Sequence, residues 1–384
     1  MNTQNTTVHI RLWNRKFWQL ALANLLLCMA VTMLIPTLPR WLMLSCGLTD
    51  EETGWAMAAF ALGLLLPGPF CSFLVQHYRR NMVCMVAIAV LAATMLVAIY
   101  AAPRALLPAV ALRTLQGAAF GLAQMVLTST LIIDTCETTQ RTEANHSATW
   151  FGRFALSLGP MAGLLAVRLF DFDHVLWAAV ACCGLAVLLI VGIRFPFRVP
   201  SDKPRAVSCD RFLLVSGWPL LLMLTAAMMS VGLMFALTLD ESFYGGLMVG
   251  FLLALLAQHY VFADAELKSE VVTGLLLVAT AQLILLSGQS SVLCAPMLGL
   301  GLGLVGARFL LFFIKLSRHC QRGTAQSTFM LGWESGLALG VGMGYLCFSA
   351  DEKSTLTMAL ILCTSVLLTY VCFGHQWFLK HKNR

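Results

Sequence analysis

The chain is divided into twelve runs of mainly apolar residues, each about 20 residues long, with short polar segments between them. A run of this length crosses the ~30 Å hydrocarbon core of a bilayer as a helix, because a helix bonds its backbone polar groups internally. Only 11% of the residues are charged, whereas soluble domains contain about a quarter. We therefore predict an all-α membrane protein with twelve transmembrane helices and no separate soluble domain. The predicted spans are about residues 17–36, 54–75, 82–101, 106–132, 146–168, 175–194, 212–238, 243–262, 270–288, 293–314, 325–348 and 355–374.

The distribution of positive charge predicts how the chain is oriented. Most lysines and arginines outside the apolar runs lie in the loops on the same side as the N-terminus, and the exceptions are Arg40, Arg104, Arg168 and Lys353. Since cytoplasmic loops carry an excess of Lys and Arg, both termini are predicted to be cytoplasmic. No small-residue cleavage site follows the polar N-terminus, so the first span is expected to remain uncleaved. We expect a multi-pass protein of a bacterial inner (cytoplasmic) membrane.

Composition and motifs argue against several other functions. The net charge of +7 comes from basic residues in the loops between spans, so it does not indicate nucleic-acid binding. The 13 cysteines are scattered without a CxxC spacing, which predicts neither a metal site nor a disulfide framework. The chain contains no P-loop, no HExxH and no nucleophile elbow. We therefore expect no enzymatic activity and no cofactor.

Residues 195–211 are the longest polar linker, contain three prolines, and separate residues 1–194 from residues 212–384. Each part carries six predicted spans, and an internal repeat at an offset of 182 residues predicts that the two parts are homologous. Parallel repeats of six helices place a substrate site between the halves near the bilayer midplane. We predict two pseudo-symmetric six-helix bundles joined by a cytoplasmic linker. The matching residues are Gly63 with Gly245, Gly68 with Gly250, Gln76-His77-Tyr78 with Gln258-His259-Tyr260, Gly117 with Gly299, and Gly121 with Gly303.

The fourth predicted span contains an arginine, Arg113, with Gln116 and Gln124 close to the same helix face. A charge at membrane depth costs several kcal/mol and usually faces a bundle interior or a water-filled cavity. Gly117 and Gly121 form a small-xxx-small pattern that lets a neighbouring helix approach closely. Two interpretations stay open here: Arg113 joins two packed helices, or it lies on a transport path.

The segment from Arg113 to Gly121 resembles the fourth-helix pattern R-x-x-Q-G-x-x-x-G of the major facilitator superfamily, whose arginine is associated with proton coupling. Pro36 and Pro39 resemble the P-x-x-P ending of the first span in twelve-span drug/proton antiporters. Gly159, Pro160 and Gly163 are similar to the antiporter motif of the fifth span, although Ala155 and Leu164 replace two of its glycines. A Gly-Pro pair within a span is expected either to kink the helix or to act as this antiporter signature.

The loop after the second predicted span departs from the superfamily's pattern G-x-x-x-D-R-x-G-R-R. Only Arg79 and Arg80 remain, and Val75 stands where the family has an aspartate that holds the cytoplasmic gate closed. The usual gate contact is therefore expected to lack its carboxylate in this chain. A hydrogen-bonded latch between His77 and His259, together with the glutamines that precede them, is one hypothesis. Two solvated histidines are the other.

Three further charges lie within predicted spans: Arg153, Arg308 and Glu334. Glu334 is rotated by about 200° from Gly332, which begins a four-residue glycine repeat, so it is expected to face the central cavity. By helix rise, Arg308 and Glu334 lie roughly 9 and 14 Å from the cytoplasmic ends, which permits an ion pair if their spans adjoin. This pair is interpreted either as a static clamp or as a titrating site.

Neutral polar residues add two candidates to the transport path. Asn24 and Gln124 are placed at membrane depth and are predicted to contact the cavity, although hydrogen bonds between helices explain most such residues. Asp134, Glu137, Arg141 and Glu143 follow the fourth span and are predicted to form a solvated loop.

The resemblance implies a monomeric secondary transporter that moves a small molecule by alternating access. Its antiporter features imply proton-coupled efflux of drug-like or amphipathic compounds, driven by the proton gradient. A transporter for a sugar, metabolite or siderophore has the same fold and is the alternative. A non-transporting membrane receptor is a further alternative, which the lack of a soluble signalling domain disfavours.

Overall fold

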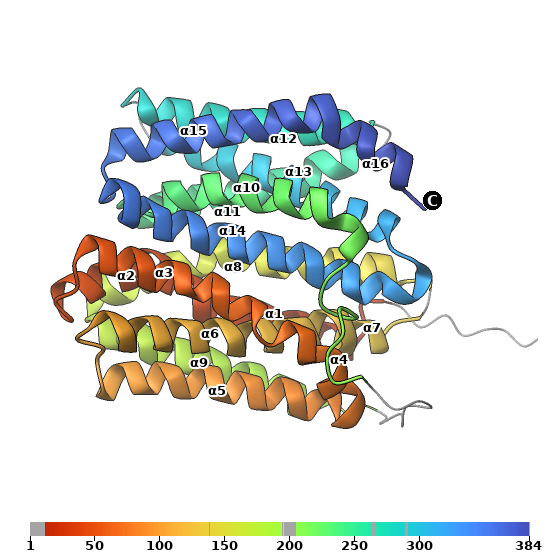
Figure 1. The fold of residues 1–384 in the computed structure, drawn as a ribbon, viewed down its shortest axis with the longest axis horizontal. Coiled ribbons are helices and arrows are strands. Elements are labelled where there is room, and N and C mark those ends of the chain that lie inside the picture. The colour runs from red at the N-terminus through yellow and green to blue at the C-terminus, as the bar shows by residue number, and fades with distance from the viewer. Residues whose placement is uncertain are drawn as a thin grey trace, which may run out of the picture.

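The computed structural model describes residues 12–137, 139–193, 195, 205–262, 266–288 and 291–383. These residues form long helices that run side by side along the longest axis of the molecule, and no strand occurs among them (Figure 1). The all-α prediction is confirmed. The first half of the chain comprises α1 (Arg15–Thr32), α2 (Leu34–Leu44), α3 (Asp50–Leu65), α4 (Gly68–His77), α5 (Arg80–Tyr100), α6 (Leu106–Val126), the π-helical turn η1 (Leu127–Leu131), α7 (Ile132–Asp134), α8 (Arg141–Leu169) and α9 (Phe172–Val191).

The second half begins with the 3₁₀ turn η2 and ends with a π-helical turn followed by a short helix. Its elements are η2 (Val215–Gly217), α10 (Trp218–Phe235), α11 (Glu241–Tyr260), α12 (Leu267–Leu286), α13 (Ser291–Leu316), η3 (His319–Gln321), α14 (Arg322–Phe348), α15 (Glu352–Thr369), η4 (Tyr370–Gly374) and α16 (His375–His381).

Side-chain caps begin several of the helices and explain how short loops suffice to connect them. Asn14, Thr49, Asp171, Asp240 and Asp351 each accept a hydrogen bond from the backbone N–H three residues further on. Such a cap satisfies one of the free N–H groups at a helix start. The polar residues between the apolar runs thus end one helix and start the next within a few residues.

Within the described residues, ten helices or continuous helix pairs are long and apolar enough to cross a membrane, and the pair α3 and α4, bent by 44°, raises this number to eleven. The remaining long helix, α14, does not reach the same apolarity. It packs against α10 on one side and α3 on the other, and most of its side chains are buried in protein. Since α14 meets other helices rather than lipid, its glycines and polar residues are tolerated. The arrangement agrees with the twelve predicted spans.

The two halves pack their helices in the same way. In the first half α1 packs against α8 and α9, α3 against α6, and α5 against α6 and α9. The corresponding pairs in the second half are α10 with α14 and α15, α11 with α13, and α12 with α13 and α15. Two related contacts join the halves, namely α3 with α14 and α8 with α11. This repetition supports the predicted two-fold arrangement of six and six helices.

We call the end of the bundle where α1 begins at Arg15 and α16 ends at His381 the terminal end, and the opposite end the distal end (Figure 1). Most of the predicted linker, residues 196–204, lies outside the described residues, as do the basic residues Arg11, Arg194, Arg198, Lys203 and Arg384. The described part of the linker returns to the terminal end and contacts both halves. Ser208 donates its backbone N–H to the carbonyl of Pro69 (2.9 Å), and Arg211 donates its own to Thr324 Oγ1 (2.9 Å).

The glycine contacts correct the register of the predicted repeat. Gly63 lies against the backbone of Gly117, and the equivalent contact in the second half joins Gly250 to Gly299. The glycine equivalent to Gly63 in the second half is thus Gly250 and not the aligned Gly245, where an added Cβ would meet no atom within 4 Å. The second span of the repeat is therefore shifted by five residues relative to the fourth. In a glycine-rich chain, glycines about one turn apart align readily at the wrong spacing.

Candidate transport pathway

Three cavities follow one another along the interface between the halves. The distal cavity has a volume of about 600 Å³, and the cavity at the terminal end has a volume of about 490 Å³. Between them lies a space of only about 20 Å³, lined by Arg113 and Glu334. Two larger cavities, which we call the vestibules, thus flank a narrow centre that holds two ionisable side chains.

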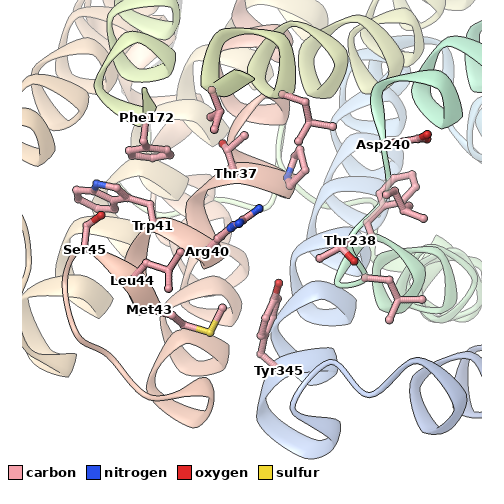
Figure 2. A pocket seen from close by; sticks show the side chains of 16 residues that line it. Thr37, Arg40, Trp41, Met43, Leu44, Ser45, Phe172, Thr238, Asp240 and Tyr345 are labelled. Atoms are coloured by element: carbon pink, nitrogen blue, oxygen red, sulfur yellow. The ribbon is translucent and has the colours of Figure 1, made fainter. Parts of the chain in front are cut away.

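The distal cavity is amphipathic. Figure 2 shows Arg40 of α2 and Tyr345 of α14 reaching into it from opposite halves, with Asp240 at one side. Trp41 stacks on Phe172 at a centroid distance of 4.7 Å and forms part of its apolar wall. From the sequence Arg40 is expected only in a loop, because it follows the P-x-x-P segment at the end of a span.

Arg113 reaches the centre of the bundle from α6. Its Nη1 donates to Gln116 Oε1 (2.8 Å), its guanidinium lies 4.7 Å from the centroid of the Phe60 ring, and its Nε has no hydrogen-bond partner among the described residues. Gln116 in turn lies near the Met95 sulfur (3.7 Å). The ring and the amide thus hold the buried cation at the cavity edge.

Glu334 lines the same cavity from α14, as the rotation from the glycine repeat predicted. It interacts with the Gln124 side chain, whose Nε2 also lies 3.4 Å from Cys28 Sγ. Asn24, one turn before Cys28, donates to the carbonyl of Ala148 (3.0 Å). Gln124 therefore contacts Glu334, which lines the central cavity, whereas the amide of Asn24 joins α1 to α8.

The predicted pair of Arg308 with Glu334 is wrong. Arg308 forms an ion pair with Glu270 of α12, a fully buried carboxylate that also accepts a hydrogen bond from Gln258 (3.1 Å). The side chain of Arg308 extends from α13 toward α12, which packs beside it, and not toward α14. Glu270 was missed because it stands at the first residue of its predicted span, where a carboxylate is expected to be solvated. The only sequence signal for it was an arginine at similar depth without an assigned partner.

Asp134 is exposed at the terminal cavity, as predicted, although it is the last residue of α7 rather than part of a loop. Asp134 forms an ion pair with Arg80 at the start of α5, and both side chains line the cavity together with Arg141 and Arg211. Burial, and then the positive charge of Arg80, lower the pKa of Arg211. Arg79 is exposed and immediately precedes α5. Arg80 thus joins the connection between the second and third spans to the end of the fourth span.

The two histidines do not form a latch in this structure. Both histidines are exposed. Among the described residues, the ring of His77 contacts Phe73 and Tyr78, and the ring of His259 contacts Tyr260. Gln76 donates to Ser72 on its own helix (2.9 Å), while Gln258 is bonded to Glu270. The five-residue shift of the repeat explains why the two triplets are not equivalent positions.

His77→Ala and His259→Ala, alone or combined, are therefore expected to leave the initial rate of substrate transport in proteoliposomes within about twofold of the wild type, since exposed side chains away from special contacts contribute little. Arg80→Gln is the comparison variant, because it removes the ion pair with Asp134 at the terminal end of the bundle. A loss of transport in the double histidine variant without loss of protein would restore the latch hypothesis.

The motif glycines provide close helix contacts. A Cβ at Gly117 would lie 2.2 Å from the Phe60 carbonyl oxygen, and one at Gly121 would lie 3.1 Å from that of Leu64. A Cβ at Gly159 would lie 2.1 Å from Thr32 Oγ1, and one at Gly163 would lie 2.5 Å from the Met33 carbonyl oxygen. Helix α8 contains Pro160 and is not interrupted there, so the kink at the Gly-Pro pair stays a prediction. The first span, in contrast, is interrupted at Met33, between α1 and α2.

Both ends of the interface are in contact around the central cavity. Toward the distal end, Gly342 of α14 lies against Gly54 of α3 so closely that a Cβ would meet its carbonyl at 2.9 Å. Toward the terminal end, Gly323 lies against the carbonyl of Ser129 in the π-helical turn η1, and Gln326 donates to Thr149 Oγ1 (2.9 Å). The two halves thus contact each other on both sides of Arg113 and Glu334.

Comparison with known proteins decides the family. A family model described as Major Facilitator Superfamily matches residues 20–341. The chain belongs to the major facilitator superfamily. This facilitator is accordingly a multi-pass membrane protein and a secondary transporter of small molecules. A search of curated proteins finds no match.

Solved structures of other transporters share the fold of this facilitator. The human organic anion transporter MFSD10 (TETRAN) is 17% identical, with a TM-score of 0.62 over 92% of this chain and 98% of that one. The nucleoside transporter NupG is 12% identical, with a TM-score of 0.67 over 93% and 99% of the two chains. An auto-inhibited POT family peptide transporter is 10% identical, with a TM-score of 0.68 over 97% and 98%. At these identities the likeness concerns the fold alone.

Proposed function

We propose that this facilitator exports an amphipathic small molecule in exchange for protons, and that Glu334 is the group that carries the proton. The observation behind the proposal is the placement of Glu334 and Arg113 on one narrow cavity between two vestibules. No ion pair joins the two side chains in the part of the chain that the structure describes, so Arg113 does not hold the carboxylate in its charged form by direct contact. A carboxylate that meets one vestibule at a time can take up a proton on one side and release it on the other.

The lining of the central cavity supports an amphipathic compound over a sugar. Apart from Arg113, Glu334 and Thr32, it consists of apolar side chains, among them Met57 and Phe60. Sites that bind polyhydroxylated compounds need several donors and acceptors, because unpaired polar groups are costly in a desolvated site. The distal vestibule, with aromatic walls and few charges, is compatible with the same class of compound.

In this scheme the proton and the substrate alternate. When the site opens to the side of high proton concentration, Glu334 is protonated and substrate is released. When it opens to the other side, Glu334 releases the proton and substrate binds. Arg113 lines the same cavity, and its positive charge favours the deprotonated form of Glu334 and so assists release of the proton.

Glu334→Gln tests the proposal, since the amide keeps the shape of the side chain but cannot titrate. In proteoliposomes, substrate accumulation driven by an acidic interior is expected to fall at least about tenfold, whereas substrate-for-substrate exchange without a gradient is expected to persist. Glu143→Gln, at an exposed carboxylate, is the matched control and should behave as the wild type. Full gradient-driven accumulation by Glu334→Gln would exclude Glu334 as the proton carrier.

The same assay separates the alternatives. Accumulation with an alkaline interior would indicate symport, as expected for uptake of a sugar, metabolite or siderophore. A panel of cationic and neutral amphipathic compounds and sugars identifies the substrate class. Absence of flux for every compound under either gradient would favour a receptor.

A further inference from the structure

Arg153 of α8 is a buried cation outside the central cavity. Its side chain is 1% exposed, and none of its three guanidinium nitrogens has a hydrogen-bond partner among the described residues. Buried charges are normally paired or hydrogen-bonded, because desolvation of an unpaired ion is costly. Arg153 therefore requires a ligand or a conformation in which its donors are used.

The surroundings of Arg153 come from both halves of the molecule. The ring of Trp150, on the same helix, lies 4.4 Å from the guanidinium carbon, and the rings of Phe329 and Trp333 on α14 lie at 6.0 and 5.8 Å. Such rings attract a cation and offset part of its desolvation, but they accept no N–H hydrogen bond in the plane of the guanidinium. The donors at its edge remain without acceptors.

One edge of the guanidinium faces a glycine. A Cβ placed on Gly306 of α13 would lie 2.9 Å from both Nε and Nη2 of Arg153. These two nitrogens form the parallel pair of donors that binds a carboxylate, sulfonate or phosphate in two-point fashion. Since α13 and α14 belong to the second half, separation of the halves uncovers this edge while Trp150 stays beside it.

The charged neighbours do not supply the missing acceptor. Glu270 acts on Arg153 electrostatically, but its carboxylate is bonded to Arg308 and Gln258. His146, one turn from Trp150 on α8, feels the positive charges of Arg153 and Arg308 and cannot neutralise them. The local field at Arg153 therefore favours an incoming anion.

We propose that Arg153 binds the anionic group of the transported compound, a carboxylate, sulfonate or phosphate carried on an aromatic or apolar body, while the interface between α8 and α13 is open. The aromatic side chains around Arg153 accommodate the body, and the Nε and Nη2 edge holds the anion. Helix α13 and the anion compete for this edge, so binding favours the open interface. The inference rests on the proposed transport function but concerns binding, which needs no proton gradient.

Binding of naphthalene-2-sulfonate and its uncharged analogue naphthalene-2-sulfonamide to the full chain in nanodiscs tests this assignment. For the wild type we expect the sulfonate to bind at least about tenfold more tightly, as two charged hydrogen bonds allow. Arg153→Gln is expected to bring the ratio of the two dissociation constants to within about twofold, and Arg153→Lys, which keeps the charge but not the paired donors, to an intermediate value. Arg168→Gln, at an exposed arginine of the same helix, should keep the wild-type ratio.

Three results would overturn the assignment: an unchanged ratio in Arg153→Gln, no preference for the sulfonate in the wild type, or displacement of the probe by inorganic sulfate as readily as by the sulfonate itself. The last result would indicate a site for a bare anion. The preference is measured without a gradient, whereas the Glu334→Gln test measures gradient-driven accumulation. A failure of proton coupling and a failure of anion binding are therefore distinguishable. If Arg153→Gln does not yield folded protein, the ratio for Arg153→Lys decides.

Discussion

Gly117→Val is expected to abolish the folded transporter. Even a Cβ at this position would lie 2.2 Å from the backbone oxygen of Phe60, a group that cannot move without shifting α3. Overpacking costs about 1–3 kcal/mol when side chains can yield, and more is expected where the obstacle is backbone. Expression followed by size-exclusion chromatography in mild detergent should show loss of the monodisperse species.

The two-fold arrangement supplies an internal replicate and a control for this substitution. Gly299→Val should fail in the same way, since a Cβ there would lie 2.2 Å from the Leu247 oxygen. Gly184→Val, on the exposed face of α9 with no atom within 4 Å of the added Cβ, should leave yield and elution volume unchanged. Normal yield of Gly117→Val would show that α3 and α6 do not pack as described.

Glu270→Ala is expected to lower the free energy of unfolding by about 3–5 kcal/mol, because it leaves Arg308 partly buried without its carboxylate partner. Removing both charges is less harmful than removing one. The double variant Glu270→Met with Arg308→Met should therefore recover most of the loss. Reversible unfolding in mixed micelles gives the free energies. A double variant less stable than Glu270→Ala would contradict a purely structural pair and indicate that the two groups act separately.

The sequence was sufficient to predict the helical architecture and part of the lining of the central cavity. Apolar runs of fixed length determine the spans, and helix rotation placed Glu334 on the cavity that Arg113 also lines. Each of these inferences depends on geometry within a single helix. Pairing across helices was not accessible in this way: Arg308 had a carboxylate at similar depth in Glu334, yet it pairs with Glu270 because α12 is its neighbour.

The internal repeat was inferred correctly in outline and incorrectly in register. Identical Gln-His-Tyr triplets aligned the halves at the ends of two helices, while the contacts of Gly63 and Gly250 show the second spans shifted by five residues. Contacts between backbones are sensitive to register, whereas exposed residues such as His77 and His259 are not. The glycine contacts, which no single sequence displays, were the decisive information.

The low apolarity of α14 has a consequence for how the protein enters the membrane. Insertion of a helix on its own depends on the transfer free energy of its side chains, and polar residues and Glu334 make that transfer less favourable for α14. Its glycine face fits against α10, and its other side fits against α3 of the first half. We therefore expect α14 to insert stably only after α10 and α3 are in the bilayer. Docking of the two halves is then a late step of assembly.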